Sequence, residues 1–256
     1  MKGLRFLNHS VSMLVRNWKD VLKIFTVPYA GLLLLGGISI YQMGGFGVGG
    51  FEAEVGAPES GFLFTRILLV ALVWVFVTLW TAVAWHRFIL LTESRSGFVP
   101  QIRIKNMFGY FLRVALIVIS LVIPVVLVGY FMVSFLGGLV HDGQFLAAAI
   151  ISGGISIVFT TVFYMMSPIL PAIAIGEDLD LTDAMGAVAD DFRAVLTSVF
   201  LLVVVTALLQ EASVLMSSVV PMLGAVFEVL VNGAYGLITI SLMTTIYGHC
   251  IQGRDL

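Results

Sequence analysis

The sequence predicts an all-α, polytopic membrane protein, and three observations carry that prediction. Of the 256 residues, 60% are hydrophobic and 11% are charged, and the mean hydropathy is +1.08. Long apolar runs recur along the whole chain, and basic residues gather at one end of these runs. A soluble domain is about half apolar and about a quarter charged. The apolar excess is too large for one water-surrounded core, so most of the chain must meet lipid.

Six stretches are long and apolar enough to cross a hydrocarbon core of about 30 Å as helices. They are residues 22–41, 62–90, 109–135, 145–171, 195–215 and 223–249. The runs are too long and continuous for barrel strands, and helices satisfy every backbone polar group in lipid. Pro168 and Pro171 predict that the fourth helix kinks or ends near Ser167, because proline removes a backbone donor and clashes with the preceding turn.

The basic residues predict the orientation in the membrane. With the N-terminus inside, twelve of the thirteen Lys and Arg residues lie at the cytoplasmic boundary, and Arg66 is the exception. Lys and Arg in short loops stay in the cytoplasm. We therefore expect a multi-pass protein of the bacterial inner membrane with both termini cytoplasmic. The apolar run from Ile24 lacks a signal-peptide cleavage site, so we expect the N-terminus to be retained.

Amphipathic segments are expected at the cytoplasmic interface between these spans. The clearest is 4–20, whose apolar side chains follow 3–4 spacing: Leu4, Leu7, Val11, Leu14 and Trp18. Residues 181–196 follow the same pattern, with Asp180 or Thr182 placed to cap the start. Residues 102–113 follow it more weakly.

These segments divide a single membrane domain, 1–256, into pseudo-repeats of about 4–91, 100–176 and 181–253. Each would be an interfacial helix followed by a span out and a span back. The first and third units end alike, in AWHRFILLTE (84–93) and IYGHCIQGRD (246–255), whereas MMSPILPAIA (165–174) lacks the aromatic. The first ending predicts that Trp85, His86 and Arg87, together with Trp18 of the amphipathic segment 4–20, form the cytoplasmic interface. The alternative stays open that any helix leaving a membrane inward ends in aromatics and bases.

The segments WHRFILL (85–91), PILPAIAIG (168–176) and the amphipathic 181–196 carry a resemblance. The chain resembles bacterial six-span inner-membrane proteins related to the membrane domain of some glycerophosphodiester phosphodiesterases. The likeness covers most of the chain as a pattern of spans and boundary residues. The catalytic barrel of those enzymes is absent from this sequence, so the resemblance implies an accessory membrane module and not their activity.

Arg66, Glu211 and Glu228 are the candidate intramembrane polar residues. Both glutamates fall in the outer halves of the last two predicted spans, where a buried charge is costly. Arg66 begins the second span at a similar depth. Three interpretations stay open: the glutamates are wet at the boundary, one of them forms an ion pair with Arg66, or they line a proton or solute path.

Catalytic and metal-binding patterns are missing from the sequence. It contains no Ser-His-Asp order, no H-E-x-x-H and no P-loop, and its one cysteine, Cys250, excludes an intrachain disulfide. GFGVGG (45–50) has G-x-G-x-x-G spacing but follows a membrane helix, so we interpret it as a flexible loop. Asp178, Asp180 and Asp183 suit a divalent cation or a surface for a cytoplasmic partner, yet acids at a helix start need neither. We expect no cofactor, no metal and no nucleic-acid partner.

Two functions follow as hypotheses. The first is a non-catalytic scaffold or accessory protein that acts on lipids or on a membrane partner, either another protein or a second copy. The alternative is a small-solute or lipid transporter with helices broken at Pro124, Gly153–Gly154 and Pro168 and with buried Glu211 and Glu228. A polar cavity touching Glu228 at mid-membrane would favour transport, and a dry, filled bundle would favour a scaffold. A membrane enzyme has the least support.

Overall fold

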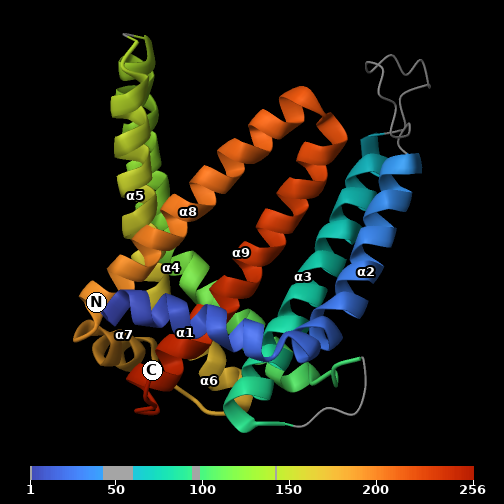
Figure 1. The fold of residues 1–256 in the computed structure, drawn as a ribbon, viewed down its shortest axis with the longest axis vertical. Helices are drawn as coiled ribbons and strands as arrows, with labels where there is room; N and C mark the ends of the chain where they lie inside the picture. Colours follow the sequence, from blue (N-terminus) through green and yellow to red (C-terminus); the bar gives the residue numbers. More distant parts are fainter. Residues whose placement is uncertain (1, 43–59, 94–98, 142) are drawn as a thin grey trace.

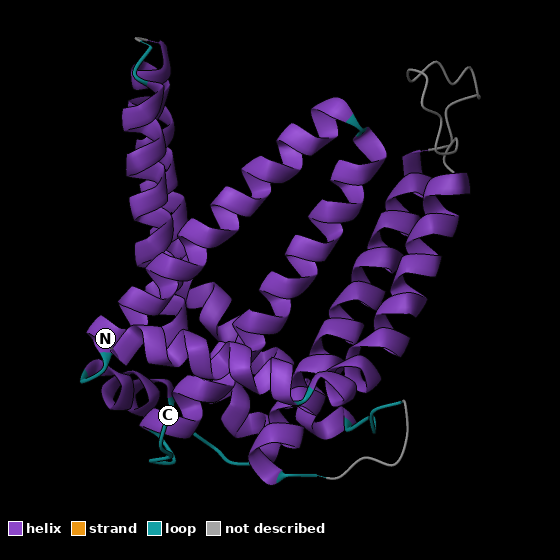
Figure 2. Ribbon diagram, viewed as in Figure 1, coloured by secondary structure: helices purple, strands orange, loops and turns teal. Residues whose placement is uncertain are grey.

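The computed structural model describes residues 2–42, 60–93, 99–141 and 143–256, and in these residues the chain is helical without strands (Figure 2). The helices are α1 (Lys2–Arg16), α2 (Trp18–Gln42), α3 (Ser60–Leu91), α4 (Ile104–His141), α5 (Phe145–Met166), α6 (Ile169–Ile175), α7 (Leu181–Ala189), α8 (Phe192–Val219) and α9 (Pro221–Cys250). The predicted all-α class is confirmed for this part of the chain. The glycine-rich loop at 45–50 lies outside the described residues.

Five helical stretches in the described residues are long and apolar enough to cross a membrane. They are Ile67–Leu91, Ile104–Leu139, Leu146–Ile175, Phe192–Val219 and Pro221–Cys250. The sequence predicted six, and the remaining one falls in α2. The first turns of α2 carry Lys19, Asp20 and Lys23. Because α2 is not among the five stretches, the count of six spans stays a prediction. Five such stretches support a multi-pass membrane protein.

Three pairs of long helices, α2–α3, α4–α5 and α8–α9, rise from a common base and diverge from one another (Figure 1). The helices within each pair pack along each other, and α5 also contacts α8. Helices α1, α6 and α7 lie in the base, as do both chain ends (Figure 1). Helix α1 runs across the lower ends of the long helices. Both termini therefore lie at the same end of the molecule.

Local signals fix some helix ends. Helix α5 ends at Met166, and Ser167 and Pro168 separate it from α6, as predicted. Gly176 closes α6 with a φ of 93°, and its backbone N–H bonds back to the last turn of that helix. Glycine adopts this left-handed conformation without the clash that a Cβ would cause.

Other expected breaks do not occur. Pro124 lies inside the unbroken α4, and Gly153–Gly154 lie inside the unbroken α5. A single proline removes one backbone hydrogen bond, and a glycine removes none. The many other backbone bonds keep the helix continuous, and neighbouring groups in a membrane helix satisfy the freed carbonyl. Within the segment 102–113, residues 104–113 form the first turns of α4 and not a separate interfacial helix, so this expectation was wrong. The segment 181–196 divides at Asp190 and Asp191 into α7 and the start of α8.

The buried core lies in the base. Phe6, Trp85, Tyr164 and Tyr247 are among its largest fully buried side chains, and α6 is buried along most of its length. The upper parts of the helix pairs are exposed and apolar: Tyr130 on α4, for example, is 75% exposed. An exposed apolar surface of this extent fits lipid as its surroundings.

Helix α1 is held against α8 at very short range. A Cβ on Gly3 would lie 2.5 Å from the carbonyl oxygen of Ala194 and 2.6 Å from Cβ of Thr197. The Ser198 hydroxyl donates to the carbonyl oxygen of Gly3 at 2.9 Å. This crossing needs glycine at position 3, and it fixes where α1 sits on the base.

Candidate functional site

His86 lies in the interior of the base, where it joins α3, α4 and α9. Its Nδ1 is 2.9 Å from Oγ1 of Thr244, and its Nε2 is 3.2 Å from the hydroxyl of Tyr110. The Thr244 hydroxyl donates to the carbonyl oxygen of Ile240, so its oxygen accepts from His86 Nδ1–H. Nε2 then accepts from Tyr110. We therefore assign a neutral His86 with its proton on Nδ1 and both ring nitrogens bonded.

The expected contact of Trp85 and His86 with lipid headgroups is not what the structure has. Trp85 is fully buried, with its ring centroid 6.2 Å from that of Phe25 and 5.8 Å from that of Phe88. Helix α1 and the start of α2 cover this end of α3. Trp18 differs, because it is 55% exposed at the corner between α1 and α2. Trp18 is therefore open to headgroups, whereas Trp85 and His86 are enclosed by protein.

Arg87 and Asn106 hold the end of α6. Arg87 forms an ion pair with Glu93 and donates to the carbonyl oxygen of Ala174 at 3.1 Å. Asn106 Nδ2 donates to the carbonyl oxygens of Ile173 and Ala174 at 3.2 and 3.0 Å. The last carbonyls of a helix lack partners within it, and these side chains supply them. The segments 85–91 and 168–176 thus pack together.

The acidic segment between α6 and α7 is tied to the base. The Tyr247 hydroxyl donates to Glu177, and Arg113 forms an ion pair with Asp178. Asp180 stands at the N-cap of α7 without a side-chain cap bond. Among the residues described, no three His, Cys, Asp or Glu side chains gather as metal ligands. The segment serves here as an attachment between helices.

Asp191, between α7 and α8, contacts one side chain of α1 and two of α9. One carboxylate oxygen lies 2.5 Å from Nζ of Lys2, and the other lies 3.4 Å from Nε2 of His249. The Cys250 thiol donates to the same carboxylate at 3.7 Å. The negative charge of a neighbouring carboxylate disfavours a thiolate, the form in which cysteine acts as a nucleophile. The contact of Cys250 with a carboxylate is therefore a packing arrangement.

Glu211 and Glu228 are exposed on α8 and α9. The chain turns between these helices at Val220, so at 1.5 Å per residue each glutamate lies about 12–14 Å along its helix from the tip of the pair. The side chain of Arg66 is outside the part that the structure describes. Its ion pair with either glutamate stays a prediction.

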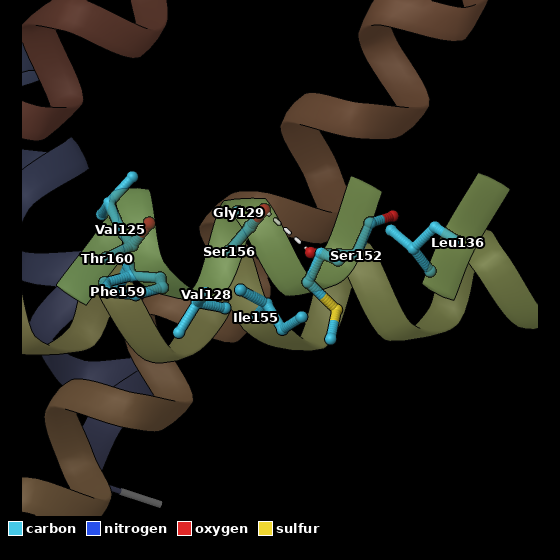
Figure 3. Close-up of a pocket in the computed structure, with 10 residues that line it drawn as sticks. Val125, Val128, Gly129, Leu136, Ser152, Ile155, Ser156, Phe159 and Thr160 are labelled. Atoms are coloured by element: carbon cyan, nitrogen blue, oxygen red, sulfur yellow. Dashed lines mark hydrogen bonds between the residues drawn. The ribbon is translucent and has the colours of Figure 1, made fainter. Parts of the chain in front are cut away.

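A groove of about 450 Å³ lies between α4 and α5 (Figure 3). Its α4 wall includes Val125 and Gly129, and its α5 wall carries hydroxyls one turn apart at Ser152, Ser156 and Thr160. Ser156 donates to the backbone oxygen of Ser152 at 2.9 Å (Figure 3), so this hydroxyl is satisfied within α5. The groove is mainly apolar, and neither candidate glutamate lines it.

Sequence reasoning missed Tyr110, Thr244 and Asp191. A polar group buried in a helix bundle needs a partner. Once His86 was known to face inward, the hydroxyls of Tyr110, Thr244 and Thr245 were thus candidate hydrogen-bond partners for it. Comparisons of the chain with models of protein families, with curated proteins and with solved structures gave no match.

Proposed function

We propose that the protein is a non-catalytic scaffold of the bacterial inner membrane, with six spans and with its base and both termini at the cytoplasmic side. Helix α2, which packs along α3, is the sixth span in this proposal. The described Lys and Arg residues at the base support the orientation, because bases stay on the cytoplasmic side. They are Lys2, Arg5, Arg16, Lys19, Lys23, Arg87, Arg103, Lys105, Arg113, Arg193 and Arg254.

The division between the base and the helix pairs carries the proposal. Polar side chains tie α1, α3, α4, α6, α8 and α9 together in the base, so this part sets the directions of the pairs. Above it the pairs diverge (Figure 1), and many of their apolar side chains are exposed. A platform that holds apolar helices apart suits a protein that receives other membrane components between or beside them.

Helix α4 offers an extended apolar face for a partner helix. Five exposed apolar side chains of α4 repeat at 3–4 spacing: Ile119, Ile123, Val126, Tyr130 and Val133, each at least 62% exposed. We call these five residues the α4 stripe. Such spacing lets two helices pack along each other at a crossing angle of about 20°. The proposed partner is therefore a membrane-spanning helix of another protein or of a second copy.

The transporter alternative has less support. Pro124 and Gly153–Gly154 do not break their helices, and the described groove contains neither Glu211 nor Glu228. His86 is fully bonded in the interior, which favours a structural role over catalysis. The scaffold proposal also agrees with the family resemblance, which implies an accessory module.

Photo-crosslinking in native membranes tests the scaffold. A benzoylphenylalanine at Tyr130, on the α4 stripe, should give a discrete protein adduct, and an adduct of twice the mass would identify a second copy. The matched control is the same probe at Leu230 on α9, which is 65% exposed, and there we expect lipid adducts. Lipid adducts at both positions in equal yield would remove the proposed partner surface.

A further inference from the structure

Helix α1 presents three different faces, and packing fixes which one is buried. Gly3, Phe6 and Ser10 are buried against the base, and the Ser10 hydroxyl lies 2.9 Å from that of Thr245 on α9. Together with the close crossing at Gly3, this contact sets the rotation of α1 about its axis. The other two faces are therefore defined by the structure and not only by sequence spacing.

The second face is apolar and uncovered. Leu4 is 57% exposed, Val11 39% and Val15 65%. At about 100° per residue these three side chains fall within a sector of about 40°. Trp18 extends the apolar surface at the corner where α2 begins, and the Lys19 ammonium lies 5.8 Å from its ring centroid.

The third face is basic. Arg5 and Arg16 are both exposed, and by the same rotation they lie about 100° around the helix from the apolar face. Along the axis they are about 16 Å apart, so they meet separate anionic groups and not one shared ligand. A helix with an apolar face beside a basic face suits the boundary between acyl chains and headgroups.

We propose that α1 and the Trp18–Lys19 corner form a docking surface for anionic phospholipids of the inner leaflet. Helix α1 runs across the lower ends of the long helices (Figure 1), so it lies along the membrane plane when these helices cross the bilayer. Arg5, Arg16 and Lys19 then meet lipid phosphates while the apolar face lies among the upper acyl chains. The inference rests on the proposed membrane placement and not on a partner along α4.

Native mass spectrometry of the full-length protein in micelles tests this surface. With equal amounts of phosphatidylglycerol and phosphatidylcholine added, the wild type should retain phosphatidylglycerol preferentially. Each base near an anionic surface adds roughly a fivefold preference, so Arg5→Gln/Arg16→Gln should lower it about 25-fold. Phosphatidylcholine retention should not change.

The matched control is Lys105→Gln/Arg193→Gln, which removes the same charge from exposed positions elsewhere in the base. The control should keep the preference. If both double variants lost the preference equally, the total charge of the protein and not this surface would explain it, and the proposal would be overturned. No loss of preference in either double variant would also overturn it. Arg5→Lys/Arg16→Lys keeps the charges and should restore the preference, which separates lipid binding from misfolding. Crosslinking at Tyr130 reports on the scaffold independently.

Discussion

The hydrogen bonds of His86 give the most direct test of the base. Replacing Tyr110 by phenylalanine keeps the ring, whose centroid lies 5.7 Å from that of His86 at an angle of 26°, and removes the hydroxyl. Nε2 of His86 is then a buried acceptor without its donor. The expected result is a less stable protein with unchanged packing.

The size of the effect follows from the geometry. Leaving a buried polar group unpaired costs about 1–3 kcal/mol, and side-chain hydrogen bonds within membrane proteins average about 0.6 kcal/mol. The bond between Nε2 and the Tyr110 hydroxyl is long at 3.2 Å, so we expect a loss of about 1 kcal/mol. Thr244→Val removes the closer contact at 2.9 Å and leaves an N–H unpaired, so we expect about 1–2 kcal/mol.

Unfolding in mixed micelles by added dodecyl sulfate, followed by tryptophan fluorescence, measures these differences. Tyr130→Phe is the matched control, because the ring of Tyr130 is 75% exposed on α4, and it should change nothing. In a His86→Leu background, Tyr110→Phe should cause no further loss, because the acceptor is already gone. Equal losses from Tyr110→Phe with and without His86 would refute the assigned bond.

Three further predictions concern other parts of the base. Gly3→Ala should lower the melting temperature by several degrees, because its Cβ would lie 2.5 Å from the backbone of α8, whereas Gly31→Ala, with no neighbour within 4 Å, should not. Equal melting temperatures would contradict the close crossing. Asn106→Leu should cost about 1–2 kcal/mol in dodecyl sulfate titrations, since it deprives the α6 carbonyls of a donor, and an unchanged midpoint would show that water replaces it. Partial burial, and then the nearby Arg16, lower the pKa of His9. The unfolded chain thus binds this proton more tightly than the folded protein does. The contribution of neutral His9 to the stability is therefore complete above about pH 6.5, and it is lost as the pH falls through the lower pKa of the folded state. Wild type should therefore lose melting temperature relative to His9→Gln between pH 7.5 and 5.5, and parallel curves would exclude the shift.

Local patterns gave the helices but not all of their boundaries. Pro168 marked the end of α5 correctly, because proline has no backbone N–H to continue the helical pattern and its ring clashes with the preceding turn. Pro124 gave a false signal for a broken α4, since one missing donor is compensated within a long helix. The interfacial segment expected at 102–113 is continuous with the rest of α4, because no residue after it interrupts the helical geometry.

The candidate site was also predicted only in part from the sequence. His86 was recognised as a notable polar residue, yet its partners Tyr110 and Thr244 lie on helices distant in sequence. Helix α3 is apolar on nearly every side, so its pattern does not say which side faces the protein. Membrane helices differ in this from soluble ones, whose buried faces are marked by the contrast with water-facing residues.

By itself the sequence predicted the helices that the described residues form and the length and apolar character that let several of them cross a membrane, because composition and short-range spacing encode these properties directly. The tertiary structure decided that α1 buries Gly3, Phe6 and Ser10 and leaves Leu4, Val11 and Val15 uncovered. It also decided that His86 is enclosed and that the helix pairs diverge. These features depend on close contacts between segments far apart in the chain, where steric fit and the need to pair buried polar groups select one arrangement.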